Sequence, residues 1–275
     1  PKLSLNSSKS RHFGDYPQAK KYGNPYPSKG ILMTDPILEV RQLTCERGER
    51  VLFKGLSFEV RPGTLVRIAG SNGAGKTTLL RLMTGLMRPL EGEILWRGEP
   101  IAKAAQDFWK ELCYIGHRNG VKDDLSVLEN VLINAEMASV PTTEAKALDA
   151  LEAVGLLDFV DSPAGQLSQG QRRRVALARL WLSESTPLWV LDEPFTALDV
   201  KGVARLADLV GKHVAAGGIV MLVTHQEVPL QAGERMVIEP EKFAPRKRTA
   251  VERALDDAHA LEAENAGSAP ASQVE

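Results

Sequence analysis

The sequence has little cysteine and no long apolar run. Its two cysteines, Cys45 and Cys113, lie far apart and outside any CxxC pair. The pattern therefore predicts neither a disulfide framework nor a structural zinc site, and it fits a reducing cytosol. No stretch reaches the roughly 18 consecutive apolar residues of a membrane-spanning helix, and no signal-peptide pattern is present. We expect any membrane role to come through a partner.

An excess of charge of either sign is also lacking. Lys and Arg number 34 against 35 Asp and Glu, and the formal net charge is −1. Because the basic residues are scattered and form no stripe, we expect no nucleic-acid partner. Hydrophobic residues make up 43% of the 275 positions. That content is enough for the buried core of one large α/β domain, with or without an appendage.

Both ends of the sequence are polar. Residues 1–33 show neither helical nor strand periodicity, so we predict a disordered tail. Met33 directly precedes the first well-patterned segment, and we hypothesise that it is the natural start. Residues 241–275 predict a short polar helix followed by a flexible Ala/Ser/Gly tail. The folded domain is thus expected over residues 34–240.

Three apolar runs between the tails are continuous rather than alternating: LVRIAG (65–70), LWVLD (188–192) and IVMLVT (219–224). Such runs are typical of strands buried on both faces, so they predict a parallel sheet covered by helices. Apolar residues at helical spacing predict helices over 79–84, 144–157 and 169–182, with Gly85 and Gly155 as helix ends. The block from about 106 to 180 is richer in helix and predicts an inserted helical subdomain.

A glycine-rich segment follows the first of these strands. GSNGAGKTT (70–78) fits G-x-x-x-x-G-K-[ST] between a strand and a helix. Its glycines permit backbone conformations in which successive N–H groups converge on phosphate oxygens. Lys76 would contact the β- and γ-phosphates, and the Thr77 hydroxyl can ligate Mg²⁺. The predicted nucleotide-binding residues are Gly70, Ser71, Asn72, Gly73, Ala74, Gly75, Lys76, Thr77 and Thr78; the alternative is a glycine-rich turn that matches by chance.

Two carboxylates end the strand LWVLD. Asp192 beside a phosphate loop suits a Mg²⁺ ligand, usually through water, and Glu193 is placed to polarise an attacking water. The alternative is an acidic strand end that only caps the next helix. A phosphate loop with a carboxylate that acts on water predicts nucleotide hydrolysis, with Lys76 and Glu193 as catalytic residues.

The segment QLSQGQRRRVALARLWL (166–182) predicts a helix with Ser168 as its N-cap. Its inward face is expected to carry Val175, Leu177, Ala178 and Leu182. Arg172 to Arg174 occupy the first turn, where acidic residues are more usual, so this helix end is interpreted as arranged for an anion. Since the chain has one phosphate loop, a second anion site suggests a nucleotide held from two sides, which requires a partner copy.

Together these motifs resemble the nucleotide-binding subunit of ATP-binding cassette (ABC) proteins over about residues 36–240. LSQGQ resembles the LSGGQ signature with Gln169 in place of one glycine, FTALD resembles the D-loop ending in Asp199, and VTHQ places His225 at the switch histidine. The resemblance implies the α/β P-loop NTPase cassette fold, with a mostly parallel core sheet, a small antiparallel β part and the helical subdomain.

The same resemblance implies ATP and Mg²⁺ as cofactors and a head-to-tail dimer. In it Ser168, Gly170 and Gln171 would meet the nucleotide of the opposite subunit. His225 would be catalytic and hold the γ-phosphate, although taken alone it is an ordinary strand-end histidine, and Asp199 would link the two sites. One copy of the motif set implies a homodimer or a heterodimer with a related chain.

Two positions depart from the general family pattern. Distance from the phosphate loop puts Arg47 where an aromatic residue usually stacks on adenine; a guanidinium plane can also stack on a base. Counting back from LSVLEN puts His117 where the family has a glutamine that contacts Mg²⁺ and water. Imidazole offers one nitrogen acceptor in place of the amide oxygen. The alternative is an alignment slip, with His117 an ordinary loop residue.

Several segments resemble one subfamily more closely, the ATP-binding subunit of the bacterial cytochrome c maturation system, or heme exporter. They are GHRNGVKDDLSVLENV, RRRVALARLWL, LDEPFTALDV and GGIVMLVTHQ. This resemblance implies a peripheral location on the cytoplasmic face of the inner membrane, bound to integral-membrane subunits. No Cys-Pro or CxxCH motif occurs, so we expect no direct heme binding. The alternatives are an ABC ATPase for another substrate and a soluble cassette acting on DNA or ribosomes.

Overall fold

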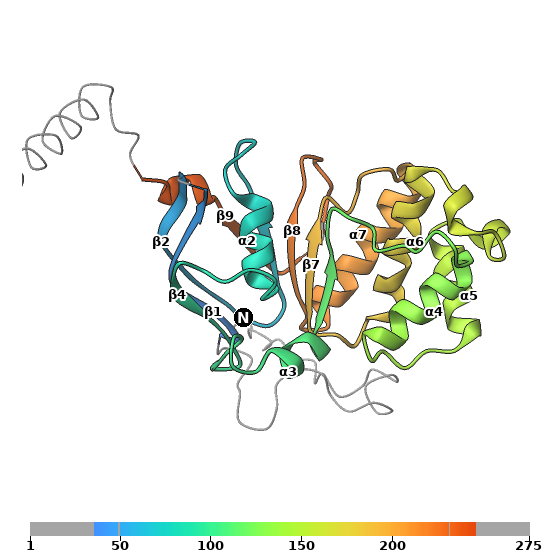
Figure 1. Cartoon of the computed structure of the whole chain (residues 1–275), viewed down its shortest axis with the longest axis horizontal. Helices are drawn as coiled ribbons and strands as arrows, with labels where there is room; N and C mark the ends of the chain where they lie inside the picture. Colours follow the sequence, from blue (N-terminus) through green and yellow to red (C-terminus); the bar gives the residue numbers. More distant parts are fainter. Residues whose placement is uncertain (1–35, 49, 231, 246–275) are drawn as a thin grey trace, which may run out of the picture.

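The computed structural model describes residues 36–48, 50–230 and 232–245 and contains two sheets (Figure 1). The smaller sheet is antiparallel, with the order β2-β1-β4-β5. Its strands are β1 (Leu38–Arg47), β2 (Arg50–Val60), β4 (Glu91–Trp96) and β5 (Glu99–Pro100). The larger sheet is parallel, with the order β6-β7-β8-β3-β9. Its strands are β3 (Thr64–Ile68), β6 (Leu112–Ile115), β7 (Leu188–Asp192), β8 (Ile219–Val223) and β9 (Glu234–Ile238).

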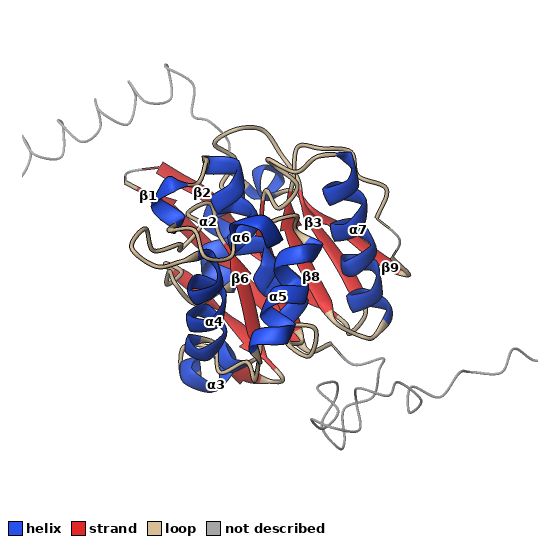
Figure 2. Cartoon of the chain, turned by 90° about the vertical axis from the view of Figure 1, so that its right-hand side faces the viewer, coloured by secondary structure: helices blue, strands red, loops and turns tan. Residues whose placement is uncertain are grey.

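The helices lie in two groups around the parallel sheet (Figures 1 and 2). The α-helices are α2 (Lys76–Met83), α3 (Ala105–Lys110), α4 (Val127–Met137), α5 (Glu144–Ala153), α6 (Gln169–Leu182) and α7 (Val200–Ala215). Short 3₁₀ turns are η2 (Leu157–Phe159), η3 (Ala164–Gln166) and η4 (Pro240–Phe243). Helix α2 lies between the two sheets, whereas α4, α5 and α6 gather at the other end of the molecule. In the described part of the chain, no helix has the length and apolar character needed to cross a bilayer.

Strand β7 explains why the predicted strands read as continuous apolar runs. Leu188 and Val190 pack in the core formed with α2 and the antiparallel sheet. Trp189 and Leu191 point to the other face and pack with α7 and the helical subdomain. All five residues of β7, and all five of β8, are buried. Because successive side chains of a strand point to opposite faces, apolar residues are needed at every position of a strand covered on both sides.

The predicted strands and helices are present with small differences at their ends. The helix expected over 144–157 ends at Ala153, and Gly155 follows in the left-handed region at φ 69°. The predicted start of the helical insertion, at about residue 106, is too early. Strand β6 comes after that residue, yet it pairs with β7 and belongs to the core sheet. The domain end expected at residue 240 is also too early, because η4 contacts the phosphate loop, as described below. Residues 1–33 with Met33, and residues 246–275, lie outside the described residues.

Candidate functional site

A cavity of about 790 Å³ lies where the phosphate loop meets the carboxyl end of β7. In open α/β sheets, ligand sites lie at this edge of the strands. Of the predicted site residues, the wall includes Arg47, Asn72, Gly73, Gly75, Lys76, Thr77, Thr78, His117, Gly170, Asp192, Glu193 and His225. The fold thus brings residues from six separate segments of the sequence to one cavity.

The phosphate loop has the backbone geometry that its glycines predict. Gly70, Gly73 and Gly75 have φ values of 136°, 81° and 91°, in a region that side chains with a Cβ seldom adopt. A Cβ on Gly75 would lie 3.3 Å from Phe53 Cε1. Lys76 Nζ donates to the carbonyl oxygens of Gly70 at 2.8 Å and Ser71 at 2.9 Å. The ammonium is therefore held across the mouth of the loop, at the start of α2.

Three residues of the predicted loop do not line the cavity: Gly70, Ser71 and Ala74. Ser71 faces away, since its N–H and its Oγ donate to Glu241 Oε2 at 3.1 and 2.6 Å. These hydrogen bonds lower the pKa of Glu241. This contact could not be predicted from local sequence patterns, because the two residues are 170 positions apart. Nucleotide contact through the Ser71 side chain is thus not supported; that side chain fixes the outer end of the loop instead.

The two predicted carboxylates occupy different settings at the end of β7. Asp192 is 3% exposed. Glu193 is in the left-handed region at φ 51°, and its N–H donates to Val223 O at 2.9 Å. Its Oε2 accepts from the backbone N–H of His225 at 3.3 Å, and its Oε1 lies 3.5 Å from His225 Nε2. Glu193 Oε1 is buried without a hydrogen-bond partner among the described residues. Such an oxygen, facing a cavity, is suited to accept from a bound water.

The donor set at the cavity suits a magnesium ion bound together with a nucleotide. The Thr77 hydroxyl and the Asp192 carboxylate both line the wall. Mg²⁺ prefers oxygen ligands and usually takes one or two from the protein and the rest from phosphates and water. The described residues contain no group of three or more His, Cys, Asp or Glu that could hold a metal alone. The residues present therefore fit a metal that arrives with the phosphates.

Several residues predicted to contact a nucleotide across a dimer cap helices in the single chain. Ser168 is the N-cap of α6, as predicted: its Oγ accepts from Gln171 N at 3.2 Å, and its own N–H donates to Gln171 Oε1 at 2.9 Å. Asp199 caps α7 by accepting from Gly202 N at 2.7 Å. Neither Ser168, Gln171 nor Asp199 lines the cavity, whereas Gly170 does.

The side chains of Arg172 to Arg174 do not supply the charge expected for an anion at this helix end, because each is engaged with other parts of the chain. Arg172 pairs with Asp123 Oδ1 at 2.7 Å and donates to Gly165 O. Arg174 donates to Val154 O and Gly155 O at the end of α5. Arg173 turns into the core and donates to backbone carbonyls. Long guanidinium side chains reach back from a helix end to neighbouring segments, so their sequence position alone does not show where the charge lies.

His117 lies exposed at the cavity wall, as the alignment predicted for a residue near the phosphates. The loop that carries it is tied to α4 by the buried Asn130, whose side chain accepts from Lys122 N at 2.8 Å and donates to Lys122 O at 2.9 Å. The wall also contains residues that sequence reasoning missed: Leu52, Asn119, Gln169, Arg173, Thr196, Ala197, Val223 and Gln226. Most of them are neighbours of predicted residues and could have been found; Arg173 could not.

Comparison with known proteins agrees with the geometry. A family model described as "ABC transporter" matches residues 53–196. The chain is 52% identical over 201 residues to the Cytochrome c biogenesis ATP-binding export protein CcmA of Escherichia coli O157:H7, which covers 73% of this chain and 94% of that protein. The relative of the same name from Shigella flexneri matches with the same identity and coverage.

Solved structures share the fold. A putative ABC transporter ATP-binding protein from Pyrococcus furiosus aligns with a TM-score of 0.63 at 27% identity, covering 76% of this chain and 99% of that one. The dimeric post-hydrolysis state of an ATP-binding cassette bound to ADP and Pi aligns with a TM-score of 0.64 at 24% identity, covering 74% and 95%. By these matches and by its own motifs, the chain belongs to the ABC transporter family and is an ATP-hydrolysing member of it.

Proposed function

We propose that this chain is the ATP-hydrolysing subunit of an export complex for cytochrome c biogenesis. It would power heme export or delivery, or release of the heme-loaded periplasmic chaperone. The observation that carries the hydrolytic part is the Glu193–His225 pair, held opposite the phosphate loop in one cavity. The match to an export protein named for cytochrome c biogenesis, over 94% of that protein, supports the rest.

The phosphate loop binds the β- and γ-phosphates of ATP in this proposal. Backbone N–H groups of the phosphate loop at the start of α2 would contact the phosphate oxygens, and the helix dipole there also favours an anion. Lys76 turns from the loop carbonyls to the phosphates and adds one positive charge. Arg47, at the far end of β1 and on the same cavity wall, stacks its guanidinium on the adenine ring.

Hydrolysis follows from the position of Glu193. Its free Oε1 accepts a hydrogen bond from water, and the water oxygen attacks the γ-phosphorus in line with the bond to ADP. The proton passes to Glu193, and the bridging oxygen leaves with ADP. His225 lies beside Glu193 and donates to the γ-phosphate. The attacking water is then held between Glu193 and the γ-phosphate. A Mg²⁺ ion held by Thr77 and, through water, by Asp192 would neutralise charge on the phosphates.

The other surface of the nucleotide is covered by a second copy. Ser168, Gly170 and Gln171 lie at the N-terminus of α6, where unpaired N–H groups favour an anion. In a head-to-tail dimer these residues contact the γ-phosphate of the opposite subunit, and Asp199 links the two sites. The dimer binds integral-membrane subunits of the cytochrome c maturation system on the cytoplasmic face of the inner membrane, with His117 in the loop between γ-phosphate and membrane partner.

The variant Glu193→Gln tests the hydrolytic site. It keeps the size of the side chain but removes the base, so we expect ATP binding within about twofold of wild type and a fall in kcat on the order of 100-fold or more. The assay is phosphate release by the full chain, with binding of a fluorescent ATP analogue measured in parallel. Glu227→Gln, an exposed carboxylate outside the cavity, is the control. Undiminished phosphate release by Glu193→Gln would refute the assigned role.

A cellular assay tests the biological part of the proposal. In cells that depend on this gene for cytochrome c, we expect Glu193→Gln to abolish holocytochrome c while the chain still copurifies with membrane subunits. Identification of those copurified subunits is the direct measurement. A wholly soluble, ribosome-bound pool, or normal cytochrome c in the absence of the chain, would contradict the proposed function while leaving the ATPase site intact.

A further inference from the structure

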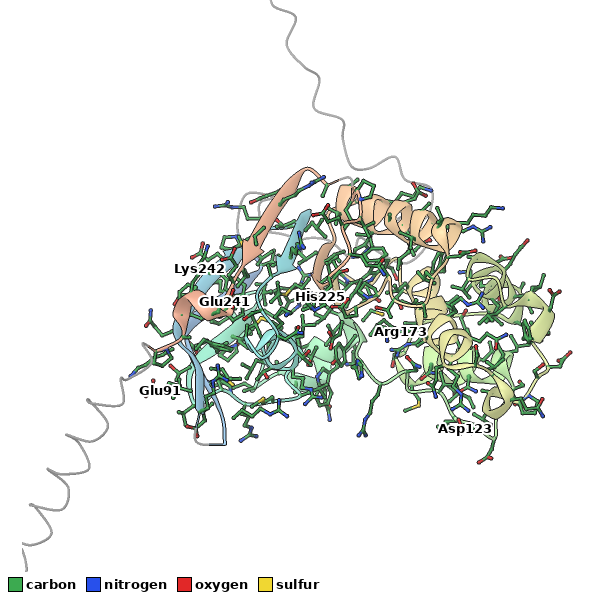
Figure 3. The ribbon with its side chains drawn as sticks, turned by 90° about the horizontal axis from the view of Figure 1, so that it is seen from above. Glu91, Asp123, Arg173, His225, Glu241 and Lys242 are labelled. Carbon is green, nitrogen blue, oxygen red and sulfur yellow. The ribbon has the colours of Figure 1, made fainter. Side chains whose placement is uncertain are left out.

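One arginine of α6 reaches the catalytic segment from outside it. Arg173 is 7% exposed, and its guanidinium lies where three segments of the chain meet (Figure 3). Its Nη1 donates to Gly116 O at 2.6 Å and lies 3.4 Å from Asn119 Oδ1. Its Nη2 donates to Asp192 O and, at 3.2 Å, to Glu193 O. All these acceptors belong to the two segments that carry His117 and Glu193.

The contacts to Asp192 and Glu193 act on a strained backbone. Glu193 has φ 51°, in the left-handed region that residues with a Cβ rarely adopt. It persists only where its surroundings hold it. The N–H of Glu193 donates to Val223 O on β8, and its carbonyl oxygen accepts from Arg173 Nη2 and from the N–H of Thr196. The guanidinium thus holds the side of this residue that β8 does not reach, and so helps to set the direction of the carboxylate.

The other contacts join the same guanidinium to the loop of His117. Gly116, whose carbonyl oxygen accepts from Arg173, directly precedes His117, and Asn119 lines the cavity. Because Arg173 itself belongs to α6, the helix that begins at Gln169 after the N-cap Ser168, one side chain connects three parts. They are the start of the LSQGQ helix, the His117 loop and the catalytic strand end.

We propose that Arg173 is a positioning residue, which fixes Glu193 and the His117 loop relative to each other and ties both to α6. A shift of α6, such as contact with a partner copy would bring, then moves the carboxylate toward or away from the attacking water. This inference rests on the proposed role of Glu193. It goes beyond that role by making hydrolysis depend on a residue that acts through the backbone and not on the substrate.

The chain offers a matched control on the same helix. Arg174 also donates to two backbone carbonyls, those of Val154 and Gly155 at 3.1 and 3.2 Å. These lie at the end of α5, and Arg174 does not line the cavity. A purely structural loss of two carbonyl contacts is therefore reproduced by Arg174→Met, without disturbing the catalytic strand end.

The test compares Arg173→Met, Arg173→Lys and Arg174→Met in the full chain. Since misplacement of a reacting group by about 1 Å can cost on the order of 100-fold in rate, we expect kcat of Arg173→Met to fall about 30–100-fold. Affinity for a fluorescent ATP analogue should stay within about twofold. Lys keeps the charge but not the two-sided fork of donors, so Arg173→Lys should lose about 3–10-fold in kcat. Arg174→Met should keep wild-type kcat and lose only thermal stability.

Several results would overturn the proposal. One is a wild-type kcat in Arg173→Met or Arg173→Lys. A second is a fall in kcat in Arg174→Met equal to that in Arg173→Met. A third is a loss of analogue affinity of about tenfold or more in an Arg173 variant, which would mean direct contact with the nucleotide. If Arg173→Met does not fold, Arg173→Lys carries the test. Glu193→Gln is assayed beside them: if it hydrolyses ATP normally, the proposed site is wrong, whereas normal Arg173 variants with an inactive Glu193→Gln reject this inference alone.

Discussion

Glu193, at the cavity, has two features that are unfavourable for folding. Its backbone is strained, and one of its buried side-chain oxygens has no hydrogen-bond partner among the described residues. Of the non-glycine residues with positive φ in the described chain, Glu193 and Ala197, at 51° and 66°, line the cavity. Glu193 Oε1 is one of the few buried polar atoms without a hydrogen bond there. Strain and unmet hydrogen bonding each cost stability. Their coincidence at one residue is the strongest local sign that this position serves chemistry.

His117 gives a prediction at this scale. It lies exposed on the cavity wall, and the proposed hydrolysis uses Glu193 and His225 instead. We therefore expect His117→Gln to keep ATPase activity within a few-fold of wild type. Coupling should change, because an amide takes the place of the imidazole nitrogen acceptor in this loop. The measurement is cytochrome c output relative to ATPase rate. Wild-type output in this variant would argue against a special function for the imidazole.

Elements meet through buried polar groups as well as apolar ones. His213 on α7 stacks on Trp189 of β7, with ring centroids 3.8 Å apart and planes 9° from parallel. Gly218, at the turn into β8, permits this contact, since a Cβ there would lie 2.2 Å from His213 Nε2. Helix α7 is thus fixed against the sheet by a flat pair of rings, and the glycine is required for space.

The stability of this contact should depend on pH. Burial lowers the pKa of His213 from its ordinary 6.5 to about 3, against opposing hydrogen bonds with the backbone of Glu184 and Pro187. Below pH 6.5 the unfolded chain binds a proton that the folded chain does not, so stability falls as pH falls. From pH 7.5 to 5 this group should account for about 2 kcal/mol of lost stability.

His213→Phe tests that dependence by urea denaturation at both pH values. The variant lacks the titrating group, so its free energy of unfolding should change about 2 kcal/mol less between pH 7.5 and 5 than that of wild type. Val214→Ala, on the same buried turn of α7, lowers stability without removing a titratable group and should keep the wild-type slope. Equal slopes for wild type and His213→Phe would reject the assignment.

At the scale of the whole molecule, most of the proposed site residues come from one part of the fold, the carboxyl edge of the core sheet. The phosphate loop, Glu193 and His225 lie on the core sheet, while the start of α6 reaches the wall through Gln169 and Gly170. The side chains of Ser168 and Asp199 cap the N-termini of α6 and α7. Their predicted contacts with nucleotide would therefore depend on a second copy, whose α6 N-terminus would meet the γ-phosphate across the interface.

A charge at Gly170 tests this arrangement. In a Glu193→Gln background with ATP and Mg²⁺, we expect a dimer in size-exclusion chromatography with light scattering. Adding Gly170→Asp should leave a monomer, because a carboxylate would repel the γ-phosphate. The helix itself should tolerate an acid in its first turn. Ala145→Asp puts the same charge at the second, exposed position of α5 and should still dimerise. A Gly170→Asp dimer of unchanged stability would contradict the two-sided site.

Most of the fold and many site residues could be predicted from the sequence, because they rest on local patterns. Continuous apolar runs predicted the buried strands, and the spacing of the glycines predicted the phosphate loop. The place of Asp192, Glu193 and His225 at the sheet edge could be predicted, because Asp192 ends a predicted strand and the other two directly follow predicted strands. Ser168 was found because an N-cap acts within one turn of helix. Each of these depends on neighbours in the chain, which the sequence states directly.

Only the tertiary structure decided where long polar side chains go. Arg172, Arg173 and Arg174 are adjacent in sequence, yet one pairs with Asp123, one enters the core beside Glu193 and one caps α5. Glu241 holds the phosphate loop from 170 residues away. A guanidinium or carboxylate can reach any acceptor within several ångströms, and its choice depends on which carbonyls packing leaves buried and in need of a donor. That need exists only once the distant segments have met.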